Sequence, residues 1–140
     1  AEASTAPVPS LARAADVVRD VRAAGLDVEL DVVGETRELP RALDLSAYRI
    51  LQEALTNVLR HAPGSTARVR LEYTRDGVDI TVRDDGRAAG DTAAGPDGVG
   101  GHGLVGMRER ARMFGGTLAA GRVDGGFEVH AHLPVAGVPA

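Results

Sequence analysis

The chain contains no cysteine, no tryptophan and no lysine, so all 16 of its basic residues are arginine. Without cysteine, disulfides and thiolate metal sites are excluded. Without lysine, the Gly-x4-Gly-Lys-Ser/Thr phosphate loop is excluded as a route to nucleotide binding. Aromatic residues make up only 3% of the chain, so Val, Leu, Ile and Ala must build any core.

The length of 140 residues and the 44% of hydrophobic residues fit one globular domain with one core. A net charge of −4 argues against a general nucleic-acid binder. No apolar run approaches the ~18 residues of a membrane span. Residues 1–10 lack the pattern of a signal peptide. We expect a linker at 1–10, one domain at 11–134 and a tail at 135–140.

Apolar residues at helical spacing predict three helices, over residues 11–24, 44–62 and 104–114. Ser10 is expected to cap the first helix and Gly25 to end it. Asp44 or Ser46 is expected to cap the second, longer helix.

Alternating apolar and polar residues predict five strands, over residues 26–33, 67–74, 78–83, 117–122 and 127–133. The Asp-Gly pair at 76–77 and the Asp-Gly-Gly run at 124–126 are typical of hairpin turns. These elements predict an α+β fold, a two-layer α/β sandwich whose helices cover one face of a five-stranded mixed sheet. Residues 85–102 form an unusually long loop, and such loops are usually functional or disordered.

The residues of the helix predicted at 44–62 fall on two different faces. An apolar arc of roughly 140° faces the core, and Glu53, Asn57, Arg60 and His61 share another arc of about 100°. Such a polar stripe is often only a solvated face. However, Asn is a mediocre helix former, and its amide oxygen is a hard ligand suited to Mg²⁺. Glu53, one turn earlier, could hold a metal-bound water or act as a base.

Two more segments carry candidate chemistry. Asp84 ends a strand and Asp85 begins a turn; the pair can be read simply as a turn, but a carboxylate there can also accept from an exocyclic amine such as adenine N6. A glycine-rich run from Gly98 to Gly103 leads into a helix, whose N-terminus favours phosphate; the alternative is a flexible linker. His102 could touch a phosphate or be solvated.

Two further histidines, His130 and His132, alternate along the last predicted strand. We expect them at the surface. Two histidines without a third ligand do not make a convincing zinc site.

The order of these motifs resembles the catalytic and ATP-binding domain of bacterial sensor histidine kinases, which shares the Bergerat (GHKL) fold with gyrase, Hsp90 and MutL-type ATPases. The resemblance covers residues 12–134. It rests on the spaced polar residues 53–61, on Asp84 with Gly86, and on the run from Gly101 to Arg110 followed by a glycine pair. The residues of these motifs are typical of the branch that partners LuxR-type response regulators.

The resemblance implies ATP and Mg²⁺ as cofactors. Asn57 resembles the Mg²⁺ ligand and Glu53 the acid that polarises or activates in this motif. Asp84 resembles the adenine-reading carboxylate, with Gly86 letting the backbone approach the ring. Residues 87–102 resemble the ATP lid. Other residues that resemble nucleotide contacts are Arg60, His61, Gly101, His102, Gly103, Leu104 and Gly106.

The implied function is transfer of the ATP γ-phosphate to a histidine on a separate dimerisation domain, because none of the four histidines here fits the acceptor motif. The implied partners are that upstream domain and a LuxR-type response regulator, without direct contact to nucleic acid. We expect a monomeric fragment of a homodimeric, cytoplasmically active kinase, and membrane anchoring of the parent protein stays open.

Three alternative functions are compatible with the same fold or with a nucleotide ligand. An anti-sigma-factor-type serine kinase would need a serine acceptor on a partner. A stand-alone ATPase would use Glu53 as a base. A degenerate nucleotide-binding or interaction module is favoured by Ala88, which stands where the family usually has glycine.

Overall fold

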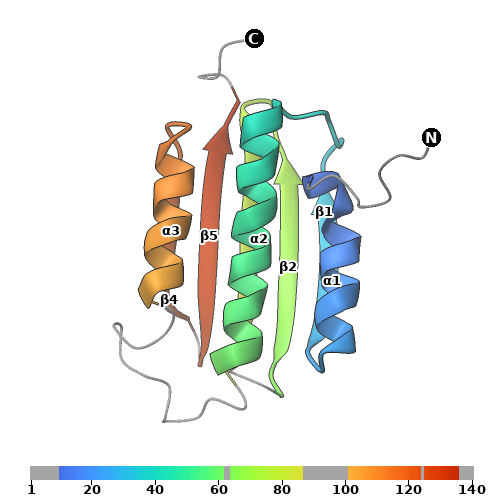
Figure 1. Ribbon diagram of the computed structural model, residues 1–140. Coiled ribbons are helices and arrows are strands. Elements are labelled where there is room, and N and C mark those ends of the chain that lie inside the picture. The colour runs from blue at the N-terminus through green and yellow to red at the C-terminus, as the bar shows by residue number, and fades with distance from the viewer. Residues whose placement is uncertain (1–9, 62–63, 87–100, 124, 136–140) are drawn as a thin grey trace, which may run out of the picture.

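The computed structural model describes residues 10–61, 64–86, 101–123 and 125–135, with the backbone alone at 101–103. Its described helices cover one face of a five-stranded sheet (Figure 1). The strands are β1 (Asp27–Val33), β2 (Thr66–Tyr73), β3 (Gly77–Asp84), β4 (Thr117–Val123) and β5 (Gly126–Pro134). Their order is β1-β2-β3-β5-β4, with β1 and β2 parallel and the other pairs antiparallel. The predicted two-layer α+β fold with a mixed sheet is therefore confirmed.

The helical layer consists of a 3₁₀ turn, η1 (Leu11–Arg13), followed by α1 (Ala14–Ala23), α2 (Arg41–His61) and α3 (Gly101–Arg112). The Ser10 hydroxyl accepts a hydrogen bond from the Ala12 N–H at 3.1 Å, so the predicted cap is confirmed. Gly25 follows the helix with a φ of 107°, a left-handed conformation that ends it.

The start of α2 was predicted wrongly. The helix begins at Arg41, and in its first turn the Asp44 N–H donates to the Pro40 carbonyl at 2.8 Å. Neither predicted cap residue serves as a cap. The Asp44 carboxylate accepts instead from the Leu11 N–H at 2.8 Å, which ties α2 to η1, and Ser46 is buried one turn inside the helix.

Helix α2 lies between α1 and α3 across the middle of the sheet (Figure 1). One side of it is buried in the core, through Leu43, Ala47, Ile50, Leu51, Ala54, Leu55 and Val58. Burying a large apolar side chain stabilises by about 1.5–3 kcal/mol, so this side fixes the rotation of the helix about its axis. The polar residues of α2 are thereby held on a defined side.

The other face of the sheet carries polar side chains that no described helix covers. Arg68 of β2 pairs with Glu29 of β1 at 3.1 Å. Asp79 of β3 contacts His130 at 3.1 Å and His132 at 3.0 Å, both on β5. These two histidines are partly exposed, as predicted. Among the described residues, no group of three His, Cys, Asp or Glu side chains could hold a metal ion.

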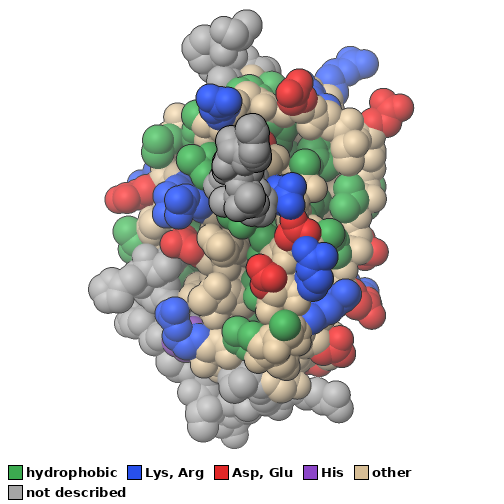
Figure 2. Space-filling model, turned by 45° about the vertical axis from the view of Figure 1, so that its right-hand side comes forward, with side chains coloured by type: hydrophobic (Ala, Val, Ile, Leu, Met, Phe, Trp, Pro, Cys, Tyr) green, Lys and Arg blue, Asp and Glu red, His purple; other side chains and the backbone are tan. Residues whose placement is uncertain are grey.

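Charges of both signs are interspersed over the α1 side of the molecule (Figure 2). On α1, Asp16 pairs with Arg13 at 2.8 Å and also with Arg19. Such exposed pairs contribute little stability, typically about 0–1 kcal/mol each. None of the helices within the described segments is long and apolar enough to cross a membrane.

Candidate nucleotide site

Three predicted motifs meet at one end of the molecule. The C-terminal end of α2, the last residue of β3 and the N-terminal end of α3 all lie at the lower end in Figure 1. This follows from chain direction, because α2 runs toward that end, β3 runs toward it antiparallel to β2, and α3 starts from it. Residues far apart in the sequence therefore share one edge of the sandwich.

Asp84 is a buried carboxylate at this edge, with only 5% of its surface exposed. Its Oδ1 accepts from the Gly86 N–H at 2.8 Å, and the carboxylate also accepts from the Phe127 N–H of β5. Burial raises the pKa of Asp84 above its ordinary value, the two backbone hydrogen bonds oppose the rise, and nearby Asp85 adds to it. Keeping a carboxylate buried in this way costs free energy of folding. Ionisable groups with such shifted pKa values are common at functional sites.

Two glycines allow the backbone around Asp84 to pack closely. Gly86 has a φ of 64°, and a Cβ atom there would collide with the Gly125 carbonyl oxygen. A Cβ atom on Gly126 would collide with the Asp84 carbonyl oxygen. The end of β3 thus rests directly on the β4–β5 turn. The close approach seen at Gly86 is one between backbones, and it is what holds Asp84 in place.

The polar stripe predicted for α2 is present. Asn57 and His61 are partly buried, Arg60 is exposed, and Glu53 is partly buried. Glu53 faces α3, where its Oε2 lies 3.7 Å from Nη2 of Arg110. Glu53 and Asn57 are one helical turn apart, so their oxygens lie on the same side of α2.

Residues 101–103, the described part of the glycine-rich run, form the start of α3, whereas the prediction placed the start of this helix at Leu104. The helix begins at Gly101, so Gly101 and Gly103 lie in a helical backbone. The N–H groups of a first helical turn have no partner within the helix, which makes this end suited to an anion. The Leu104 side chain is buried in the core.

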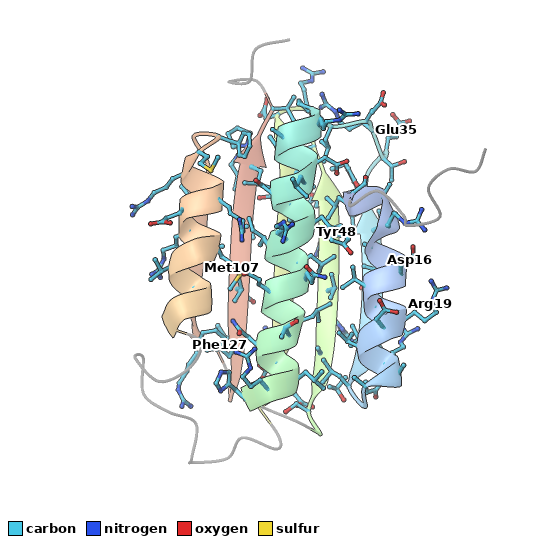
Figure 3. The ribbon with its side chains drawn as sticks, viewed as in Figure 1. Asp16, Arg19, Glu35, Tyr48, Met107 and Phe127 are labelled. Atoms are coloured by element: carbon cyan, nitrogen blue, oxygen red, sulfur yellow. The ribbon has the colours of Figure 1, made fainter. Side chains whose placement is uncertain are left out.

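Packing against the sheet holds α3 in place. Met107 lies between α3 and the sheet with none of its surface exposed (Figure 3). Gly106, beside it, differs from the glycines near Asp84, because a Cβ atom there would meet nothing within 4 Å. The protein's own packing therefore does not require a glycine at position 106.

Some predicted features fall outside the description. Residues 87–100, with Ala88 and most of the predicted lid, lie outside the described residues, and so does the side chain of His102.

Two features of the site were not predicted from the sequence. Arg110 was part of a quoted motif but received no role, because its contact with Glu53 depends on α2 and α3 lying side by side. Phe127 and Gly126 were assigned only to a strand and a turn. The doubled glycine at 125–126 was the available signal for the close backbone approach.

A two-layer sandwich that gathers the end of α2, the end of β3 and the start of α3 at one edge is a nucleotide-binding domain of the Bergerat type. The family described as histidine kinase-, DNA gyrase B-, and HSP90-like ATPase matches residues 43–137. This match spans more than half of the chain, and the chain belongs to this family.

Several curated relatives are named sensor histidine kinases. The chain is 38% identical over 113 residues to sensor histidine kinase YxjM of Bacillus subtilis, covering 79% of this chain and 26% of that protein. It is 33% identical over 112 residues to sensor histidine kinase NarS of Mycobacterium tuberculosis, covering 79% and 26%. The chain thus spans about a quarter of the length of these relatives, and it corresponds to their ATP-binding catalytic domain.

Solved structures confirm the fold. The blue-light activated histidine kinase of Erythrobacter litoralis EL346 matches with a TM-score of 0.72 at 21% identity, over 92% of this chain and 42% of that one. The catalytic domain of histidine kinase ThkA, in a nucleotide-free form, matches with a TM-score of 0.66 at 15% identity, over 89% and 91%.

Proposed function

We propose that this domain binds Mg-ATP and transfers the γ-phosphate to a histidine on a separate dimerisation domain. The observation that carries the proposal is the buried Asp84 carboxylate, held at the same end of the molecule as the polar end of α2 and the start of α3. Phosphoryl transfer needs positioning and charge neutralisation more than covalent help from the protein, and these elements would supply both.

Asp84 is the proposed adenine contact. In its ionised form the carboxylate only accepts hydrogen bonds, which matches the N6 amine of adenine and disfavours the O6 carbonyl of guanine. The hydrogen bonds from Gly86 and Phe127 orient it before any ligand arrives. ATP is therefore expected to bind more tightly than GTP.

The residues on α2 fit a magnesium ion. Glu53 Oε1 is a buried acceptor without a hydrogen-bond partner among the described residues, and the Asn57 amide lies one turn away. Asn57 would hold the ion and Glu53 one of its waters, which suits an ion that keeps several waters when bound. Bound Mg²⁺ would neutralise charge on the phosphates. Arg60, His61 and the N–H groups at the start of α3 would bind the phosphate oxygens.

The proposed partners follow from the relatives. Sensor histidine kinases act with a response regulator, and we propose a LuxR-type regulator, a homodimeric parent protein and a cytoplasmic place of action. We propose that the acceptor histidine lies outside this domain, since none of its four histidines fits the acceptor motif. His130 and His132, in addition, contact Asp79 on the uncovered sheet face, away from the helices.

Titration calorimetry with ATP and GTP, each with and without Mg²⁺, tests the proposal. We expect ATP to bind more tightly than GTP, and Mg²⁺ to strengthen ATP binding. Incubation of the ATP-loaded domain with its dimerisation domain should then yield an acid-labile phosphohistidine. An acid-stable phosphoserine on a partner, or steady ATP hydrolysis by this domain alone, would support a serine kinase or an ATPase instead.

Replacing Asn57 with Ala is expected to remove most of the gain in ATP affinity that Mg²⁺ gives, about tenfold. The fold should not suffer, because Ala is the better helix former. Calorimetry with and without Mg²⁺ measures the effect. Gln52→Ala, an exposed position on the same helix, is the matched control. An Asn57→Ala domain with an unchanged Mg²⁺ effect would exclude Asn57 as the ligand.

Replacing Gly106 with Ala is expected to change stability and binding in opposite directions. Ala is favoured over Gly inside a helix by about 0.8–1 kcal/mol, and the added methyl group meets nothing within 4 Å. If phosphates approach the backbone here, the methyl group should weaken ATP binding about tenfold. Urea denaturation and calorimetry measure the two effects. A more stable variant with unchanged affinity would show that ATP does not approach position 106.

A further inference from the structure

Glu53 and Arg110 join α2 to α3 through an incomplete contact. Nη2 of Arg110 lies 3.7 Å from Oε2 of Glu53, which is too long for a hydrogen bond. Two further atoms of the pair, Glu53 Oε1 and Arg110 Nε, are buried and have no hydrogen-bond partner among the described residues. About one third of each side chain is exposed, at 38% for Glu53 and 33% for Arg110.

The two unpaired atoms are the ones that a complete pair would join. A guanidinium and a carboxylate form a bidentate pair with two parallel N–H···O bonds. Nε and Nη2 lie on one edge of the guanidinium and can together bind both oxygens of one carboxylate. A complete bidentate pair would join Nη2 to one carboxylate oxygen and Nε to the other, and neither hydrogen bond is present in the structure.

We propose that Arg110 is a positioning residue for Glu53, and that their bidentate pair closes when nucleotide phosphates bind at the start of α3. This inference rests on the proposed function, because it needs phosphates at that helix end. Buried polar atoms without partners are costly, so a small displacement of α3 toward α2 that pairs them would recover part of that cost. The bound nucleotide would supply the attraction that holds α3 there.

Closing the pair would fix the carboxylate of Glu53. Each carboxylate oxygen has two lone pairs, so a bidentate pair with Arg110 leaves one lone pair on each oxygen for a metal-bound water. Arg108 and Arg112, on the same helix, are exposed. Lysine at position 110 could not reproduce the planar pair of donors.

Calorimetry with Mg²⁺ and a non-hydrolysable ATP analogue tests this role. Arg110→Ala is expected to lower affinity about tenfold, and Arg110→Lys to recover little of it. Arg108→Ala is the matched control and should bind like the natural chain. Glu53→Ala combined with Arg110→Ala should bind no more weakly than Glu53→Ala alone. Losses that multiply in the double variant, or an Arg110→Ala affinity equal to that of Arg108→Ala, would overturn the inference.

Nuclear magnetic resonance of the arginine Nε–H groups gives a readout that does not depend on activity. The Arg110 resonance, assigned by its absence in Arg110→Lys, should move downfield and exchange more slowly with water when the analogue saturates the domain. If the analogue binds and this resonance stays unchanged, the inference fails while the proposed function stands. If the natural chain binds no nucleotide, the proposed function itself fails.

Discussion

Replacing Asp84 with Asn is expected to weaken ATP binding by about 10- to 100-fold, because a hydrogen bond to a charged group contributes about 1.5–3 kcal/mol. The same substitution should leave the fold at least as stable. The Asn amide oxygen can still accept from the Gly86 N–H, and the substitution removes a buried charge. Calorimetry and urea denaturation of the same samples measure the two effects.

The stability difference between the natural chain and the Asp84→Asn variant should depend on pH. The pKa of Asp84 is raised in the folded state above its ordinary value of 3.8. The stability that its protonated form contributes is therefore fully present below that value and is lost as pH rises through the raised pKa. Asn does not ionise, so the advantage of the Asp84→Asn variant should grow from acidic to neutral pH and then level off.

The affinity of the natural chain for ATP should also depend on pH. As pH falls toward the raised pKa, the natural chain loses its adenine acceptor, so ATP affinity should decline at a higher pH than an ordinary aspartate would produce. Asp85→Asn is the control, because Asp85 is an exposed neighbour that accepts from the Thr66 N–H at 3.2 Å. Its effect on ATP affinity should stay within about twofold. Equal losses in the two variants would argue against Asp84 as the specific contact.

Replacing Gly86 with Ala should destabilise the fold by about 2–4 kcal/mol, a large part of the stability of a small domain. Two effects add at this position. The φ of 64° is unfavourable for a residue with a side chain, and the new Cβ atom would collide with the Gly125 carbonyl oxygen. ATP affinity should fall as well, because the backbone shift that relieves the collision would displace the Gly86 N–H that orients Asp84.

Gly121→Ala is the matched control for this prediction. Gly121 lies in strand β4, and a Cβ atom there meets nothing within 4 Å. Its stability in urea should remain within about 0.5 kcal/mol of the natural chain. If Gly86→Ala were as stable as Gly121→Ala, the backbone contact beneath Asp84 would not have the importance assigned to it.

The elements of this fold could be predicted because their signals are local. The apolar arc of α2 repeats at the helical period. Strand β2 alternates between buried and more exposed residues throughout, as do β3 from Val78 and β5 from Glu128. The errors arose where a partner is distant in sequence. Asp44 has the residue type of a helix cap, but its hydrogen-bond donor is Leu11, which is 33 residues away.

The site could be predicted in part for the same reason. Asn57 and Glu53 were proposed as site residues from the pattern of one helix, and Asp84 from the end of one strand. That Asp84 is buried, and that Phe127 donates to it, depends on β3 and β5 being neighbours, which no local pattern states. The start of α3 was missed because glycine has a low helix propensity, whereas packing of Leu104 and Met107 against the core stabilises the helix that follows.

The uncovered face of the sheet offers a place for a spectroscopic label. Side chains on this face alternate along each strand with those of the core, so a change there leaves the helical layer untouched. Since the chain has no cysteine, Arg68→Cys would introduce its sole thiol, on an exposed position of β2. A dye attached there would follow the tumbling of the domain, and hence its docking onto larger partners, from the side opposite the helices.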